Sequence, residues 1–119
     1  MFEKHIDLQI NPGGKKPSLR VSQHEEGTVT ITLMDGNEQF MIPEKMSIDL
    51  NAALPSGDGY LCSTEIKDRE VVATIPSLFT EEPGTVSCQL SFWNMGDYSL
   101  SDLFTISVKV ARVSAEEGG

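Results

Sequence analysis

Apolar and polar residues alternate with a period of two along most of the chain, which indicates β-strands rather than helices. In residues 28–34, Val29, Ile31 and Leu33 alternate with three threonines, a pattern typical of a half-buried strand. Similar alternation or short apolar runs mark residues 5–10, 46–50, 60–66, 70–76, 85–93 and 103–110. The chain is therefore expected to be rich in strands.

Turn-forming residues separate these segments, above all in NPGGKKP (11–17), Asp35–Gly36 and PSGDG (55–59). The one helical candidate is a turn within residues 76–82, where Ser77 is a suitable cap. We predict an all-β fold, an antiparallel immunoglobulin-like β-sandwich of about seven to eight strands. The sandwich is expected to span residues 1–112, and 113–119 to form a flexible acidic tail or the start of a linker.

Cys88, in the strand-like stretch VSCQLSFW, raises the question of an immunoglobulin disulfide. In that pattern a tryptophan lies between the two cysteines and a tyrosine precedes the second by two places. Here Trp93 follows both Cys62 and Cys88, and Val86 stands at the tyrosine position. The sandwich is therefore expected to lack the inter-sheet disulfide pattern. Cys88 then reads as a small buried hydrophobe with a free thiol, although a bridge to Cys62 stays open.

The charge balance argues against some partners. Nine basic residues against eighteen acidic residues give a net charge of −9. Such a chain repels phosphate backbones and anionic membrane surfaces, so we expect neither nucleic-acid nor membrane binding. The opening MFEKHIDLQI has no apolar signal-peptide core, and no apolar run reaches the length of a membrane span.

No group of residues predicts a catalytic, cofactor or metal site. The two histidines, His5 and His24, lie near the N-terminus, and no short-spaced ligand pair suggests zinc. Glu81 and Glu82 are adjacent on a predicted turn and read as solvated charge rather than as a glycosidase pair. We expect a non-enzymatic protein without a cofactor.

The order of the pieces resembles the N-terminal domain of the phage baseplate upper protein family. The matching segments are ATIP (73–76), EEPG (81–84), VSCQLSF (86–92) and FTISVKV (104–110), and the resemblance covers about residues 5–111. It implies a structural part of a siphophage or prophage tail tip, assembled in the host cytoplasm. Such a domain attaches to the tail hub (distal tail) protein, forms homo-oligomers in the baseplate, and helps carry receptor-binding proteins.

A docking surface is expected at the N-terminal strand, at the loop 11–17, and at the edge around the tryptophan, with six candidate residues: Phe2, Ile6, Lys15, Lys16, Trp93 and Tyr98. Two alternatives stay open. The N-terminal strand and loop can be a plain edge strand and a solvated loop, and Trp93 can cap the core instead of anchoring a partner. A carbohydrate-binding module of a tail fibre or cell-wall enzyme is the alternative function, because exposed aromatic rings serve there too.

Overall fold

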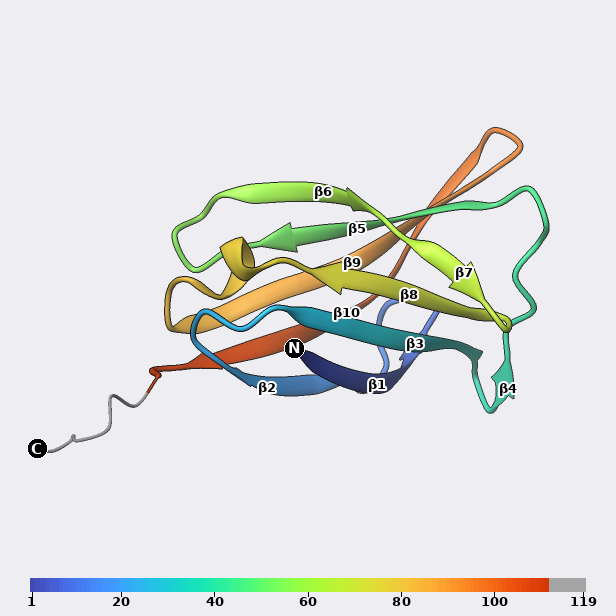
Figure 1. The fold of residues 1–119 in the computed structure, drawn as a ribbon. Coiled ribbons are helices and arrows are strands. Elements are labelled where there is room, and N and C mark those ends of the chain that lie inside the picture. Colours follow the sequence, from blue (N-terminus) through green and yellow to red (C-terminus); the bar gives the residue numbers. More distant parts are fainter. Residues whose placement is uncertain (112–119) are drawn as a thin grey trace, which may run out of the picture.

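The computed structural model describes residues 1–111, which form two β-sheets packed face to face (Figure 1). Sheet A contains β1 (Phe2–Gln9), β3 (Gly27–Asp35), β4 (Glu38–Gln39), β7 (Glu65–Lys67) and β8 (Glu70–Ile75). Sheet B contains β2 (Ser18–Ser22), β5 (Ser47–Ala53), β6 (Gly59–Ser63), β9 (Gly84–Asn94) and β10 (Asp97–Lys109). The all-β prediction is confirmed, whereas the expected boundary at residue 112 lies outside the described residues.

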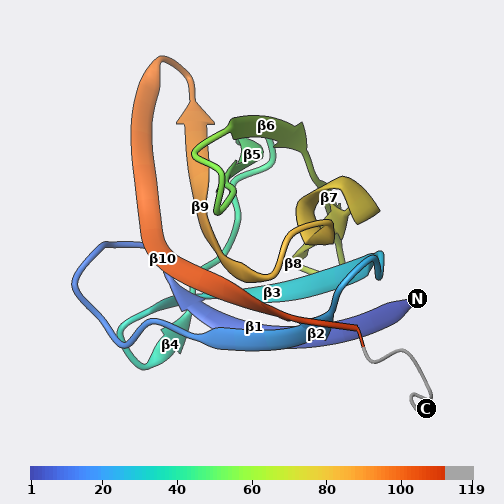
Figure 2. The same ribbon diagram turned by 90° about the vertical axis from the view of Figure 1, so that its left-hand side faces the viewer.

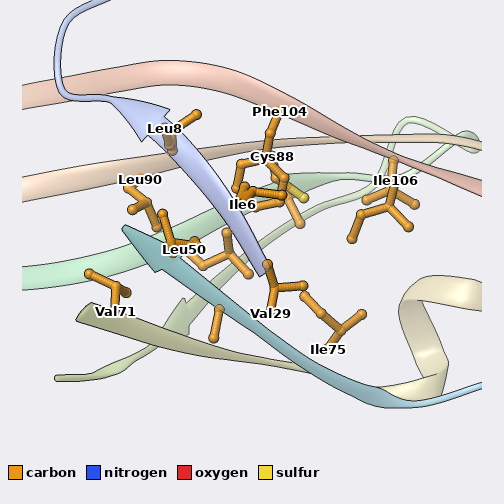
Figure 3. Packing of buried hydrophobic residues seen from close by; sticks show 14 of the residues in the cluster. Ile6, Leu8, Val29, Leu50, Val71, Ile75, Cys88, Leu90, Phe104 and Ile106 are labelled. Carbon is orange, nitrogen blue, oxygen red and sulfur yellow. The ribbon is translucent and has the colours of Figure 1, made fainter. Parts of the chain in front are cut away.

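The core forms where the alternating apolar residues of both sheets meet. In β3, Val29, Ile31 and Leu33 are fully buried, while the threonines between them are only partly buried. Figure 3 shows such side chains from both sheets directed into one cluster. Because side chains alternate between the two faces of a strand, the period-two pattern alone assigns one face of each long strand to the core.

The pairing of the first two strands differs from the predicted antiparallel sandwich. β1 runs parallel to β3, with Ile6 opposite Ile31, and β2 runs parallel to β10, with Val21 opposite Val108. Parallel neighbours need a connection that crosses over. Here β2, which lies in the opposite sheet, is the crossover between β1 and β3. Both sheets are therefore mixed.

The described residues also form ten strands instead of seven or eight. The segment expected as one strand over 60–66 is divided at Thr64 into β6 of sheet B and β7 of sheet A. The Thr64 hydroxyl donates a hydrogen bond to the Ile48 carbonyl, 2.6 Å away, at the point where the chain changes sheets. A strand that bends from one sheet to the other is a common way to make a corner in a sandwich.

The predicted helical turn is a 3₁₀ helix, η1 (Ser77–Thr80), whose cap position is occupied by Pro76 rather than by Ser77. Thr80 fastens it to the loop between β2 and β3. Its hydroxyl donates to the Glu25 carbonyl at 2.6 Å, and its carbonyl accepts from the His24 amide at 2.9 Å. Among residues 1–111, no helix is long and apolar enough to cross a membrane.

Candidate interaction surface

The β9–β10 hairpin extends beyond the body of the sandwich (Figure 2). β9 has 11 residues and β10 has 13, whereas β5, which pairs with β9, has only 7. The pairing of β5 with β9 ends where Ser47 lies opposite Trp93. The residues past Trp93 are therefore paired only within the hairpin. The end of the hairpin past Trp93 therefore has no strand neighbour in the body of the sandwich.

A two-residue turn, Met95–Gly96, closes the hairpin. Both residues have positive φ angles, 52° and 94°, as a type I′ turn requires. Asparagine or glycine is the usual first residue, because a longer side chain is strained in this conformation. Methionine here is instead 85% exposed. An exposed apolar side chain at a position with an unfavourable backbone conformation suggests a functional role.

Four apolar side chains gather at this end of the hairpin, and we call Trp93, Met95, Tyr98 and Leu100 the tip patch. They are 49%, 85%, 52% and 36% exposed, respectively. Trp93 and Tyr98 are opposite each other in the ladder, and their ring centroids lie 4.8 Å apart with planes inclined by 53°. Cross-strand aromatic pairs of this kind stabilise each other's position, so these two rings are held together without a partner.

A β-bulge marks the base of the extended part. Ser101 and Asp102, both buried, lie opposite the single residue Leu90. The Ser101 hydroxyl accepts from the Leu90 amide at 2.9 Å, and Asp102 Oδ1 accepts from the Leu103 amide at 2.9 Å. Gly14 of the loop 11–17 lies against the Asp102 carboxylate, where a Cβ would stand 3.2 Å from Oδ2. The bulge thus places the hairpin and this loop in one region.

The six expected contact residues divide into three groups. Trp93 and Tyr98 form the exposed pair described above, and Trp93 points away from the core instead of capping it. Lys15 and Lys16 are exposed on the loop 11–17. Phe2 and Ile6 are instead only 8% and 7% exposed, because β1 packs their side chains between the sheets. Their side chains therefore belong mainly to the core.

Sequence reasoning missed Met95 and Leu100. Both residues lie in NMGDYSLSD (94–102), a segment that is rather polar and is typical of a turn, so neither was expected at a contact surface. The available signal was the pair Met95–Gly96, in which an apolar residue takes a turn position that usually carries asparagine.

The outer face of sheet A carries a polar network that resembles a catalytic relay. The Thr32 hydroxyl donates to the Glu70 carboxylate, and His5 Nε2 lies 2.7 Å from the Thr32 hydroxyl and 3.2 Å from Glu70 Oε2. The Thr32 hydrogen bond, and secondly His5, lowers the pKa of Glu70. A nucleophile–base–acid relay uses both nitrogens of the histidine, whereas here one nitrogen faces both oxygens. The arrangement is that of a surface polar network.

Both cysteines are free thiols in the structure. Cys88 is fully buried on β9, and Cys62 is partly buried on β6. Burial, with a smaller contribution from Cys62, raises the pKa of Cys88 to about 12. A thiol with so high a pKa is not a nucleophile at neutral pH, which agrees with its interpretation as a small core residue.

A comparison with solved structures finds the same architecture in another protein. The structure superposes on the N-terminal domain of phage TP901-1 ORF48 with a TM-score of 0.63, over 92% of this chain and 99% of that chain. The two share one fold. At 14% sequence identity the match concerns the fold alone, and for the fold it confirms the resemblance drawn from the sequence. No protein-family model and no curated protein sequence matches the chain.

Proposed function

We propose that this domain is a structural, non-enzymatic component of a phage tail baseplate that docks on the tail hub protein and helps carry receptor-binding proteins. The fold supports this, because the structure that it matches along nearly its whole length is a domain of a phage protein, and the sequence itself resembles the baseplate upper protein family. In this proposal the domain is assembled in the host cytoplasm, repeats as a homo-oligomer, and resides at the tail tip of the virion. Symmetry then multiplies a modest contact on each copy.

The tip patch is the observation that carries the docking proposal. It joins a tryptophan, a tyrosine and a methionine, residue types that are enriched at the centres of protein interfaces. It lies at the end of a projecting hairpin, so a partner reaches it without displacing the sandwich (Figure 1). Burial of such an anchor is typically worth about 2 kcal/mol. We propose that the tip patch inserts into an apolar depression on the hub protein.

The alternative, a carbohydrate-binding module, draws on the same two aromatic rings. A flat sugar ring stacks best on an aromatic face that is open and not crossed by a second ring. Trp93 and Tyr98 are inclined to each other by 53° and cover part of each other's surface. This geometry favours a shaped protein pocket over a sugar, and we therefore place the carbohydrate reading second.

Co-expression with the distal tail protein encoded at the same locus tests the proposal. Size-exclusion chromatography with light scattering should show a complex that contains several copies of the domain. The variant Trp93→Ala/Tyr98→Ala should weaken it about 30-fold or more, because each anchor contributes about 2 kcal/mol or a large part of it. Ile66→Ala is the matched control, since Ile66 is 45% exposed on the other sheet. This control should bind as the unchanged protein does.

The possible failures separate the two parts of the proposal. If the unchanged domain elutes as a monomer beside its hub protein, docking by this domain is wrong. A fluorescence shift of Trp93 with cell-wall sugars would then support the carbohydrate reading. If the complex forms but the double variant binds equally well, docking stands and the tip patch is not its surface. Melting curves of both variants check that these exposed substitutions leave the fold intact.

A further inference from the structure

Three of the nine basic residues gather in one hollow on a protein of net charge −9. Lys4 comes from β1, Arg20 from β2 and Lys109 from the last position of β10. The hollow has a volume of about 300 Å³, and its full lining is Phe2, Lys4, Arg20, Val21, Ser22, Glu25 and Lys109. We call it the basic hollow. It is the parallel pairing of β2 with β10 that brings Arg20 and Lys109 together, and the edge strand β1 that adds Lys4.

The basic hollow lies far from the tip patch. Asp97 begins β10 beside the hairpin turn, and Lys109 ends it, 13 residues along one strand. At about 3.3 Å per residue the two ends are roughly 40 Å apart along the strand. In Figure 1 the hairpin projects at one end of the sandwich, and the C-terminal end of β10 lies at the other. A partner in the basic hollow would therefore not compete with one at the hairpin.

The cations of the hollow have no acidic partners within residues 1–111. The ion pairs in this part of the chain join His5 to Asp7 and to Glu70, and none involves a lysine or arginine. Glu25 is the one carboxylate that lines the hollow, and its Oε1 accepts a hydrogen bond from the Ser22 amide at 2.9 Å. Three cations against one carboxylate leave a local excess of positive charge that the lining within residues 1–111 does not neutralise.

We propose that the basic hollow binds an acidic peptide segment, rich in aspartate and glutamate, of a second partner protein. Arg20 offers the planar fork that pairs with a carboxylate through two hydrogen bonds, and Lys4 and Lys109 add compact charges on either side. The net charge of −9 opposes a nucleic acid, whose long phosphate backbone would meet repulsion beyond the hollow. A short acidic segment feels the local cations and little of the remaining surface, because salt screens charges beyond about 8–10 Å.

The physical character of the contact sets what binding should look like. All three cations are exposed, so each pair with a carboxylate is weak, and affinity arises from several pairs together. Binding should therefore weaken as salt is added, and it should require more than one acidic residue in the peptide. This inference does not depend on docking at the hairpin, since it concerns another surface and another partner.

The test uses the full chain and a fluorescein-labelled hexaglutamate peptide, followed by fluorescence anisotropy. The unchanged protein should bind the peptide, and binding should weaken at least about tenfold when salt rises from roughly 50 to 500 mM. Arg20→Glu/Lys109→Glu should weaken binding at least about tenfold at low salt. Lys15→Glu/Lys16→Glu is the matched control, because it changes the net charge equally on the exposed loop 11–17, and it should alter binding less than about twofold.

Three results would overturn the inference. An equal loss in both double variants would mean that only net charge matters. Equal binding of a hexalysine peptide would remove the charge argument, and tighter binding of a short DNA duplex would assign the hollow to a nucleic acid.

Arg20→Gln/Lys109→Gln removes the two charges without reversing them and should still weaken binding about threefold or more. Melting curves confirm that the variants compared are folded.

Discussion

Replacing Ile6 by alanine should destabilise the domain strongly, although Ile6 lies on an edge strand. Its side chain is 7% exposed and stands opposite Ile31 in the parallel pair of β1 and β3. The change removes three buried carbons at about 0.8 kcal/mol each, which gives a loss of roughly 2.4 kcal/mol. The cavity left behind adds to this, so we expect the free energy of unfolding to fall by about 3 kcal/mol.

Urea unfolding followed by far-ultraviolet circular dichroism measures this change. The midpoint should fall while the slope with urea stays constant, since the folded structure and its buried area are retained. Ile6→Val removes one carbon and should cost about 1 kcal/mol. Glu3→Ala is the control on the same strand, because Glu3 is exposed, and it should shift the free energy by no more than about 0.5 kcal/mol.

A particular outcome would refute the reasoning. If Ile6→Ala costs less than about 0.5 kcal/mol with an unchanged slope, β1 is not packed between the sheets. Ile6 would then be free to serve as the contact residue that the sequence suggested. A graded loss from Ile6→Val to Ile6→Ala would instead show that Ile6 acts through packing.

Three further outcomes follow from individual contacts. Gly27→Ala should destabilise the domain by about 2 kcal/mol or more in the same urea assay, because its Cβ would overlap the backbone carbonyl of Phe2. Cys88 should resist a thiol reagent at about pH 8 in the folded protein and react once urea unfolds it, because burial raises its pKa to about 12. Rapid labelling of Cys88 in the native state would contradict this. Glu70 has a lowered pKa in the folded state, so its stabilising contribution is present above its unfolded value and is lost as the pH falls through the folded value. Thr32→Val should therefore lower the free energy of unfolding at about pH 7 and do so less at about pH 3, and an equal loss at both would refute the linkage.

Local patterns predicted the secondary structure well. Alternation identified the buried faces of the long strands, including Val86, Cys88 and Leu90 of β9. It did so because burial on one face needs only the side-chain period of the strand itself. The absence of the immunoglobulin cysteine pattern likewise pointed to free thiols, which the structure contains.

The exposure of the candidate contact residues was harder to predict, since exposure depends on neighbours that are distant in sequence. Phe2 and Ile6 have the same alternation whether β1 covers the core or projects from an edge, and only the packing of sheet B against them distinguishes the two. Trp93 and Tyr98 were predicted as contact residues from their residue type alone. Met95 belongs to the tip patch because the turn places it at the end of the hairpin.

The amino-acid sequence by itself thus determined a strand-rich chain with one apolar face per long strand, a turn at Asp35–Gly36, and two cysteines outside the disulfide pattern. The tertiary structure alone decided the parallel pairs, the bend at Thr64, and the meeting of Lys4, Arg20 and Lys109 in one hollow. The physical reason is the distance along the sequence between the residues that interact. A period of two is set by each strand's own backbone, whereas the choice of neighbouring strand depends on how both sheets close one core together.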